Sequence, residues 1–360
     1  MSLSSDLLPG VPLVESPFFD QSLDAMGLAP HEREIAIALN RRGFAVFDFP
    51  DALLGERIDR IKANLASRYT VDLASPDSIK AQGDQRVQDA WLFDEDVRAI
   101  AINAEVVDLL GRLYGRPAVP FQTLNFPVGT QQHFHSDSIH FSSLPERFMC
   151  GVWLAMEDIH ADAGPLEYCP GSHKWPIISN SAIGERRWVD RSGGAQIPYE
   201  PVWRELIAAS GGHTERFLAR KGQALIWAAN LLHGGSRQAD PTRTRWSQVT
   251  HYYFEDCIYY TPAYSEEALG RYDVRAITNI ATGHHQPNRF MGEEIAPPPR
   301  PRNKGVLDRL RRGRGAGALP RDFDAQAYYR LNPDVAAAGE DAASHYLKHG
   351  RGEGRRYAVD

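Results

Sequence analysis

Two patterns of apolar residues divide the chain. In the N-terminal third the apolar positions have the spacing of amphipathic helices, which predicts helices over residues 30–42, 54–69 and 94–115. Gly43 is expected to end the first helix and to turn the chain into FAVFDF (44–49), a predicted strand. The segment before these helices is rich in Pro, Ser and Asp, and we expect it to be an irregular lead-in of about thirty residues.

Beyond Pro117 the pattern changes to short apolar or alternating runs that Gly, Pro and Asp interrupt. Runs of this length and composition predict β-strands. Helices followed by many short strands indicate an α+β chain whose catalytic part is a β-sandwich or barrel. The predicted strands lie in PFQTLNF (120–126), RFMCGVWLAME (147–157), GPLEYCPGSH (164–173), GQALIWAANLLH (222–233) and RWSQVTHYYFE (245–255).

The C-terminal part of the chain has a different texture. Residues 298–319 are rich in Pro, Arg and Gly without apolar periodicity, which predicts a linker between a domain over residues 1–297 and a small unit over 320–360. At about 40 residues this unit is near the lower limit for independent stability. It holds two short helical patterns, and its expected core is Tyr328, Tyr329, Leu331, Val335, Tyr346 and Leu347.

The net charge of −6 over 360 residues hides an asymmetry between these parts. From Pro298 onward there are 13 Lys and Arg against 8 Asp and Glu, whereas the first 297 residues hold 27 against 38. The basic stretch RPRNKGVLDRLRRGRG (300–315) is best explained as a solvated linker. It has no aromatic residues that could stack on bases, so we do not expect a nucleic-acid partner.

Composition and cysteine usage favour an ordinary globular protein, with 42% hydrophobic and 24% charged residues. There is no apolar run of about 18 residues and no basic start followed by an apolar core, so we expect neither a membrane span nor a signal peptide, and a cytoplasmic location. Cys150, Cys169 and Cys257 are too scattered for a thiolate metal cluster and too few for a disulfide framework. We expect reduced, mostly buried thiols.

Candidate chemistry is concentrated in TQQHFHSDSIHF (130–141), a loop that leads into the strand-like segment SIHFSS. In an extended segment residues i and i+2 project from the same face, so His135 and Asp137 can reach one metal ion. His133 shares this spacing and is a rival ligand. A second His-x-Asp triplet, His160 to Asp162, lies in a polar turn, where such residues usually cap or solvate.

A third candidate ligand, His233, ends the apolar run KGQALIWAANLLH and precedes two glycines. The absence of side chains behind His233 suits a ligand that shares its metal with exchangeable molecules. Two histidines and one carboxylate leave three positions of an octahedral Fe(II) open, as in non-haem oxygenases. Structural zinc needs a closed shell of four ligands, but catalytic zinc held by the same residue types stays open as an alternative.

Arg245 favours the iron alternative. It begins a predicted strand after His233, where a guanidinium inside an apolar barrel can bind a carboxylate through two hydrogen bonds. An Fe(II) enzyme that uses 2-oxoglutarate needs such a group for the distal carboxylate of this cosubstrate. The alternative is an ordinary surface arginine on a strand.

Five segments in this order resemble the phytanoyl-CoA dioxygenase family of Fe(II)- and 2-oxoglutarate-dependent oxygenases. They are VQDAWLF, HSD, WLAMEDIHADAGPLEYCPGSHKW, KGQALIWAANLLHGG and RWSQVTHYYF, between about Arg86 and Phe254. The resemblance implies a double-stranded β-helix, that is, a cupin-like jelly roll with a core at about 117–256 and flanking N-terminal helices. It also implies Fe(II), 2-oxoglutarate and O2 as cofactor and cosubstrates, with ascorbate as a reductant. The site residues it implies are His135, Asp137 and His233 for the metal, and Arg245, Trp153, Arg86 and Gln122 for 2-oxoglutarate.

The chain departs from the family pattern in two places. The spacing from His233 to Arg245 is one residue longer than expected, which keeps Arg243 as a rival for the cosubstrate. Gly235 stands where some members have Ser, so a hydroxyl contact is absent or comes from Ser236. The carboxylate that halogenating relatives lack is present here as an aspartate, so the resemblance implies hydroxylation or another oxidation. In the family turn PGSH, His173 is expected to be structural.

The C-terminal segment resembles a small helical module of bacterial surface-glycan and glycosyltransferase-associated proteins. The resemblance rests on NPDV (332–335) and on HYLKHG with a following EGR. It implies a glycan or cell-envelope setting and a possible docking partner. His345 and His349 are four residues apart, but no third ligand lies nearby in the sequence, so we do not expect a zinc site.

The leading hypothesis is a dioxygenase that hydroxylates a small-molecule, lipid or glycan-linked substrate with release of succinate and CO2. Two alternatives are a catalytically silent jelly-roll protein that binds a small acid or glycan, and a cupin-like zinc enzyme. Succinate production separates the first from both. The substrate pocket is expected to be lined by loops 173–203 and 281–294, where Arg186, Arg187, Trp188, Arg191 and Arg289 offer possible anion or sugar contacts.

Overall fold

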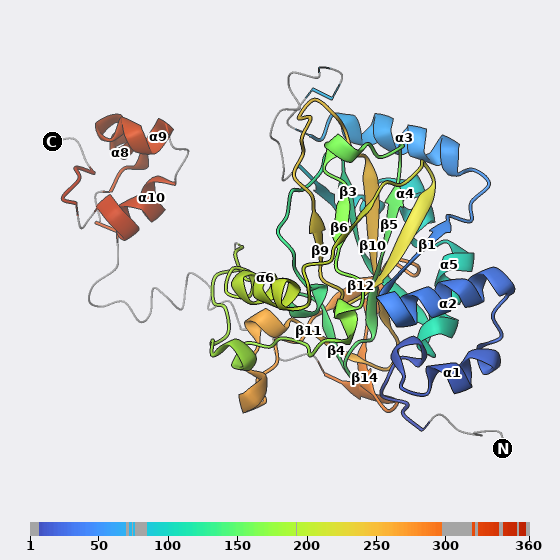
Figure 1. Ribbon diagram of the computed structural model, residues 1–360. Coiled ribbons are helices and arrows are strands. Elements are labelled where there is room, and N and C mark those ends of the chain that lie inside the picture. The colour runs from blue at the N-terminus through green and yellow to red at the C-terminus, as the bar shows by residue number, and fades with distance from the viewer. Residues whose placement is uncertain are drawn as a thin grey trace. The chain divides into compact units, whose positions relative to one another are not determined.

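The computed structural model describes residues 7–69, 72–73, 75, 85–191, 193–296, 319–320, 323–337, 341–350 and 353–357 (Figure 1). The chain divides into two compact units, Met1–Pro297 and Pro298–Asp360. The predicted linker over residues 298–319 lies outside the described residues except for Leu319. Each unit is therefore described by itself.

The N-terminal lead-in is more ordered than predicted. It contains the 3-10 turn Leu13–Glu15, the short helix α1 (Phe19–Ser22) and the 3-10 turn Leu23–Met26. Val14, Phe19 and Met26 are buried in the main core. The prediction of an irregular segment was wrong because these elements are too short to show a periodic pattern, and burial of their apolar side chains holds them in place.

Helix α2 (Pro30–Arg42) and strand β1 (Phe44–Asp48) form where the sequence predicts them. Pro30 occupies the first turn, where its missing N–H leaves no hydrogen bond unmade. Gly43 ends the helix with φ = 84°, a left-handed conformation that favours glycine. A Cβ at Gly43 would also lie 2.5 Å from Nδ1 of His173. This glycine therefore fixes both the turn and the close approach of the PGSH segment.

Three further helices pack on the same side of the main sheet, α3 (Leu54–Ala66), α4 (Glu95–Ala101) and α5 (Ala104–Tyr114). Asp94 and Asn103 cap the N-termini of α4 and α5 by accepting backbone N–H groups. Figure 1 shows α2 to α5 on one side of the sheet and α6 (Glu200–Ala209) on the other. All three predicted helical stretches are thus present.

The main sheet is antiparallel, with six strands in the order β1-β8-β5-β10-β3-β2. A second antiparallel sheet of three strands has the order β7-β6-β9. The strands of the main sheet after β1 are β2 (Val87–Gln88), β3 (Ala118–Phe126), β5 (Met149–Ala155), β8 (Gln223–Ala228) and β10 (Ser247–Phe254). Those of the smaller sheet are β6 (Leu166–Tyr168), β7 (Glu215–Phe217) and β9 (His233–Gly235).

Alternation along the strands separates two apolar layers. Val152 and Ile226 face the helices, whereas their neighbours Trp153 and Leu225 pack against Leu166 of the smaller sheet. The two sheets therefore face each other across a shared apolar layer, and the predicted α+β jelly roll with flanking helices is confirmed. Strand β1, outside the predicted jelly-roll residues, joins the edge of the main sheet through β8.

Shorter hairpins and pairings complete the first unit. They are β4 (Ser142–Leu144) with β11 (Ile258–Tyr260), β12 (Ile277–Asn279) with β13 (His284–Gln286), and β14 (Asn288–Phe290) with β15 (Glu293–Ile295). Among the residues described above, no helix is both long and apolar enough to cross a membrane.

The C-terminal unit is a small cluster of helices, α8 (Ala325–Leu331), α9 (Pro333–Ala337) and α10 (Ala342–His345), followed by a π-helical turn, Tyr346–Gly350. Tyr328, Val335 and Tyr346 are buried in its core, as predicted. Leu347 was wrongly assigned to this core, because its side chain is 41% exposed. Leu347 lies in the π-helical turn, where the side chains do not follow the spacing of an α-helix, so an α-helical pattern does not predict which of them are buried.

We expect a chain shortened to residues 1–297 to remain folded and to bind metal as the full chain does, because the main core lies within these residues. Its melting temperature should change by no more than about 4 °C. Calorimetric melting and metal titration of both chains measure this. Insolubility, or melting many degrees lower together with loss of metal, would show that the C-terminal unit is a structural part of the domain.

Candidate metal and cosubstrate site

The two predicted histidine ligands meet through their backbones. His135 and His233 form an isolated antiparallel bridge, in which N of His135 donates to O of His233 at 2.9 Å and N of His233 donates to O of His135 at 3.0 Å. The bridge joins the loop after β3 to the first residue of β9. His233 was expected to end a strand, but it begins one. The chain leaves β8 at Ala228 and enters the smaller sheet at His233.

Asp137 lies in a 3-10 turn, Asp137–Ile139, and not in the extended segment expected from SIHFSS. Ser136 favours the turn, because its Oγ accepts the N–H of Ser138 at 3.2 Å. Strand β4 begins only at Ser142. The Asp137 side chain nevertheless lies close to both histidines. The i, i+2 spacing of His135 and Asp137 therefore brings these two side chains together even though the segment is not a continuous strand.

Candidate ligand atoms of His135, Asp137 and His233 all lie within 4.8 Å of one another, and all three residues are buried. Nε2 of His135 is 3.7 Å from Oδ1 of Asp137, and Nε2 of His233 is 3.9 Å from Oδ2. One ion between these atoms would be bound by two imidazoles and one carboxylate. This donor set suits a non-haem iron with open positions, and zinc is the other metal that favours imidazole and carboxylate.

Backbone carbonyls set the orientation of both imidazoles. Nδ1 of His135 is 3.0 Å from O of His133, and Nδ1 of His233 is 3.0 Å from O of Leu231. Since a carbonyl can only accept, each Nδ1 carries the proton and each Nε2 presents its lone pair to the candidate metal position. Burial, and then the nearby His233, lowers the pKa of His135 to about 3, so this imidazole is neutral and able to bind metal at physiological pH.

An indole from the main sheet holds the carboxylate. Nε1 of Trp227 donates to Oδ2 of Asp137 at 2.8 Å. Burial alone would raise the pKa of Asp137, but the surrounding histidines and this hydrogen bond outweigh it and lower the pKa to about 2. The carboxylate is therefore ionised across the physiological range, with Oδ1 free of this bond.

Gly151 makes room for the indole. A Cβ at this position on β5 would lie 2.1 Å from Cζ2 of Trp227, a distance that real Cβ atoms do not reach. Gly151 pairs with Trp227 across the main sheet. Any side chain here would therefore displace the indole that holds the carboxylate.

The two glycines after His233 permit a close approach of the preceding loop. A Cβ at Gly234 would lie 2.7 Å from O of Gln132, and a Cβ at Gly235 would lie 2.8 Å from Oγ1 of Thr130. Gly234 also lines the cavity, so the expectation that it clears space beside the metal position stays a prediction. Ser236, the candidate for a cosubstrate hydroxyl contact, donates to Oε2 of Glu167 at 2.7 Å.

Arg245 is a buried cation that faces the same cavity. Only 2% of it is exposed, and Nη1 donates to O of Gly164 at 3.1 Å. Its Nε is buried without a hydrogen-bond partner, and its guanidinium carbon lies 5.8 Å from the centroid of a Trp153 ring. No carboxylate of the described residues pairs with it, and burial lowers its pKa to about 10. A buried, charged and unpaired guanidinium fits a ligand that brings its own carboxylate.

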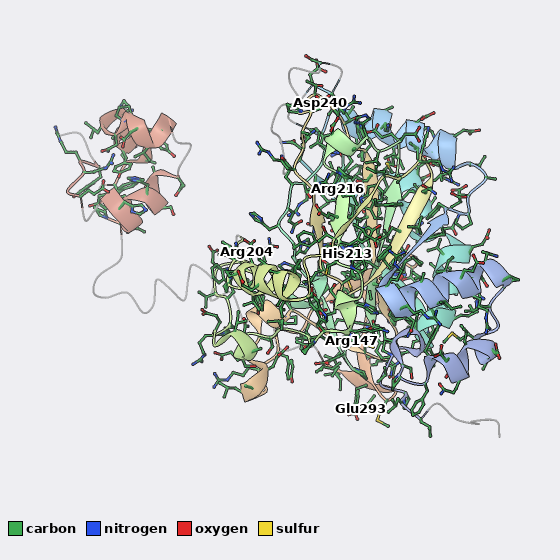
Figure 2. All side chains as sticks on the ribbon, in the orientation of Figure 1. Arg147, Arg204, His213, Arg216, Asp240 and Glu293 are labelled. Atoms are coloured by element: carbon green, nitrogen blue, oxygen red, sulfur yellow. The ribbon has the colours of Figure 1, made fainter. Side chains whose placement is uncertain are left out.

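Arg243, the rival for the cosubstrate, lies at the surface. Its Nε is 3.0 Å from Oδ2 of Asp240, and 43% of its side chain is exposed. Figure 2 labels Asp240 at the outer edge of the unit, in the loop between β9 and β10. The segment in which an extra residue is expected belongs to this loop, so the expectation is compatible with the buried position of Arg245.

Gln122 and His251 extend the site along the main sheet. They are paired across β3 and β10, and Oε1 of Gln122 accepts from Nδ1 of His251 at 3.0 Å. Nε2 of His251 consequently faces the candidate metal position, 3.8 Å from Oδ2 of Asp137. Burial lowers the pKa of His251 to about 4, so it adds a neutral third imidazole beside the metal ligands.

A cavity of about 730 Å³ opens in front of these residues. Of the two loops expected to line it, residues 193–197 and Glu200 do so, but none of 281–294 does. Arg186, Arg191 and Arg289 pair with acidic side chains outside the wall, at Glu266, Asp273 and Glu294. All seven predicted site residues are in the wall, namely His135, Asp137, His233, Arg245, Trp153, Gln122 and the exposed Arg86.

The remaining histidines of the sequence prediction do not join the metal ligands. The side chain of His133 is exposed, and only its carbonyl takes part, as the acceptor for His135. His160 caps a 3-10 turn by accepting N–H of Asp162 at 3.2 Å. His173 is buried behind Gly43 with Nε2 2.9 Å from O of Asn40, which gives it the structural role expected.

Among the wall residues that sequence reasoning did not assign to the site, Trp227, His251 and Arg275 are the ones with a clear part in its chemistry. The first two lay in quoted motifs, and their even spacing from Leu225 and Val249 could have placed them on the cavity face. Arg275 lies beyond the predicted jelly-roll residues, and no local pattern distinguishes it from other loop arginines.

Known proteins were compared with this chain. The sequence profile of the family described as phytanoyl-CoA dioxygenase (PhyH) matches residues 39–243. Ectoine dioxygenase of Halomonas elongata is 25% identical over 244 residues, which cover 64% of this chain and 70% of that protein.

Two of the similar solved structures contain 2-oxoglutarate, also called alpha ketoglutarate. EctD from S. alaskensis with 2-oxoglutarate and 5-hydroxyectoine has a TM-score of 0.47 and 18% identity, covering 71% of this chain and 85% of that one. The epimerase SnoN with Fe3+, alpha ketoglutarate and nogalamycin RO has a TM-score of 0.46 and 18% identity, covering 64% and 86%.

We expect His135→Ala and His233→Ala each to abolish stoichiometric Fe(II) binding, because each removes one of three ligands. His160→Ala should bind about one Fe(II) per chain, as the unaltered protein does, because His160 only caps an exposed turn. Anaerobic metal titration followed by elemental analysis measures this. Equal loss of iron in the His160 variant would contradict the assignment of the ligands.

Trp227→Phe should weaken Fe(II) binding by roughly 10- to 100-fold, the usual effect of removing a hydrogen bond to a metal ligand. Gly151→Ala should have the same direction of effect, since it displaces the same indole. Trp203→Phe is the matched control, because Trp203 is equally buried but packs in a separate cluster with Tyr199. Unchanged affinity in the Trp227 and Gly151 variants would show that the indole does not support the ligand.

Proposed function

The chain belongs to the phytanoyl-CoA dioxygenase family, and on that premise we propose that it hydroxylates a small molecule with release of succinate and CO2. Its relatives are iron- and 2-oxoglutarate-dependent dioxygenases, and the chain is an enzyme of this kind. The single observation that carries the proposal is the combination, in one cavity, of a buried His-Asp-His cluster and a buried arginine without a carboxylate partner.

In this proposal His135, Asp137 and His233 hold Fe(II). Their protonation states are those that metal binding needs, with a carboxylate and with imidazoles that present Nε2. The bound Fe(II) and 2-oxoglutarate would supply the oxidation of an unactivated C–H bond by O2, coupled to oxidative decarboxylation of 2-oxoglutarate. Three ligands leave three positions of an octahedral ion for exchangeable molecules.

Arg245 would bind the distal carboxylate of 2-oxoglutarate. Removal of a carboxylate from water into this buried place is favourable only if a cation and hydrogen bonds meet it, and Arg245 offers both. Trp153 packs beside the guanidinium and limits its movement. Arg86, the residue before β2, and Gln122 on the neighbouring strand β3 are proposed as further contacts of the cosubstrate.

The protein's other contribution is the shape of the cavity. Phe126, Leu166 and Val249 give its wall an apolar part beside the polar residues, against which the apolar part of a substrate would pack. A volume of about 730 Å³ suits a molecule of drug-like size. The proposal therefore covers small molecules, and a lipid or glycan-linked substrate only where its reacting part has that size. The presence of Asp137 supports hydroxylation over halogenation, because the ion keeps its carboxylate ligand.

With Fe(II), O2 and ascorbate, the protein should slowly convert 2-oxoglutarate to succinate even without its own substrate. Arg245→Met should raise the KM for 2-oxoglutarate about a hundredfold or more, since removal of one partner of a buried charge pair costs roughly 3–5 kcal/mol. Arg243→Met is the matched control and should change KM less than twofold, because Arg243 is exposed and pairs with Asp240. The rate of succinate formation, measured over a range of 2-oxoglutarate concentrations, gives the uncoupled activity and the KM of each variant.

Two outcomes would contradict the proposal in different ways. Absence of succinate from iron-loaded protein would favour a silent binding protein or a zinc enzyme. A large effect of Arg243→Met together with none of Arg245→Met would place the cosubstrate on the surface loop. Melting temperatures of both variants separate loss of binding from loss of fold.

A further inference from the structure

The cavity carries more positive charge than the proposed cosubstrate uses. Among the residues that the structure describes, its wall holds three arginines, Arg86, Arg245 and Arg275, against two carboxylates, Asp137 and Glu200. In the proposed function, Fe(II), Asp137, the 2-oxoglutarate dianion and Arg245 sum to zero charge. Arg86, which is proposed as a further contact of the cosubstrate, and Arg275, which has no role in that proposal, then remain against Glu200.

Arg275 is the more enclosed of these two arginines. Its guanidinium carbon lies 4.9 Å from the ring centroid of Phe141 and 6.0 Å from that of Phe121. Nη1 donates to Oγ1 of Thr261 at 3.1 Å and more weakly to O of His140 at 3.4 Å. Nε is buried and has no hydrogen-bond partner. The guanidinium is therefore oriented by neutral groups, while its Nε edge is left for another molecule.

Three other arginines, which lie outside the cavity wall, have acidic partners. Arg186 and Arg271 both pair with Glu266, and Arg191 pairs with Asp273 at 2.7 Å. These acids lie close to Arg275 in the chain, yet no described carboxylate forms an ion pair with Arg275 itself. A partly buried guanidinium that packs on aromatic rings without a counter-ion is stabilised when a ligand supplies the opposite charge.

The position of Arg275 separates it from the cosubstrate. Arg245 precedes β10 and packs on Trp153, whereas Arg275 packs beside Phe141, whose ring lies 4.9 Å from that of His251. Arg245 and His251 are six residues apart along an extended segment, roughly 20 Å of backbone. His251 in turn lies 3.8 Å from Asp137. Arg275 therefore belongs to the part of the wall near the metal ligands but away from Arg245.

We infer that Arg275 binds an anionic oxyacid group, a carboxylate or a phosphate, of the primary substrate. The inference rests on the proposed function and names the class of its substrate. The anion would be held by the Nε edge of the guanidinium, with the adjoining part of the substrate against Phe141 and next to the metal ligands. Arg86, exposed in the wall, adds a second positive charge that attracts such a molecule.

The test measures binding of simple probes to protein saturated with Ni(II), a redox-inert substitute for Fe(II), and with 2-oxoglutarate. The probes are benzoate, phenyl phosphate and benzyl alcohol, which share an aromatic body and differ in charge. By calorimetry, at least one anion should bind at least tenfold more tightly than benzyl alcohol. The anion that binds more tightly distinguishes a carboxylate from a phosphate substrate.

Arg275→Met should remove this tenfold preference and leave the affinity for 2-oxoglutarate within twofold. Arg275→Lys, which keeps the charge and loses the planar donor edge, should retain part of the preference and serves if the Met variant is unstable. Arg271→Met is the matched control, because Arg271 lies in the same segment, is exposed and pairs with Glu266. It should leave binding of probes and cosubstrate unchanged.

Three results would overturn the inference. Wild-type protein could bind benzyl alcohol as tightly as both anions, or Arg275→Met could keep the preference for an anion. Alternatively, Arg275→Met could lower the affinity for 2-oxoglutarate, which would place Arg275 in the cosubstrate site while the proposed function stands. Failure of wild-type protein to bind 2-oxoglutarate at all would instead remove the proposed function, and the inference with it.

Discussion

The reciprocal backbone hydrogen bonds between His135 and His233 are the contact on which the site depends. They join a loop of the N-terminal half of the jelly roll to the smaller sheet, and so bring two ligands from distant parts of the chain to one point. Because the bonds involve backbone atoms, they leave both imidazoles free. Gly234 and Gly235 permit this approach, since a Cβ at either position would collide with the loop. The glycines beside the second histidine are thus a structural requirement of the metal site.

Hydrogen bonds to the three candidate ligands determine which of their atoms can bind a metal. Carbonyls of His133 and Leu231 fix which nitrogen of each imidazole is protonated, and Trp227 holds one oxygen of Asp137. Gly151 in turn makes space for that indole. These hydrogen bonds are needed because the carboxylate and the two imidazoles are buried. Without water around them, fixed protein dipoles keep the protonation states that metal binding requires.

The other notable feature of the cavity is its two arginines without acidic partners. Arg245 and Arg275 are enclosed by aromatic and backbone groups, and neither has a carboxylate partner among the described residues. A buried unpaired cation lowers the stability of the free protein, so its presence is understandable where binding of an anion repays that energy. In our proposals the buried Arg245, beside Trp153, binds the cosubstrate, and the partly buried Arg275, beside Phe141, binds the substrate. The exposed arginines nearby are paired and have no such role.

Local patterns in the sequence determined the helices, most strands and the ligand types, because these depend on spacing and on side-chain chemistry within a few residues. The His-x-Asp spacing and the later histidine picked out the three candidate ligands that the fold brings together, and the strand arginine proved to be a buried cation. Only the tertiary structure decided how Asp137 is held, since Trp227 and Gly151 come from other strands. It also showed that His233 begins β9, that the short N-terminal turns are part of the core, and that Arg275 enters the cavity. These features arise from contacts between residues far apart in the chain, and no local pattern can express them.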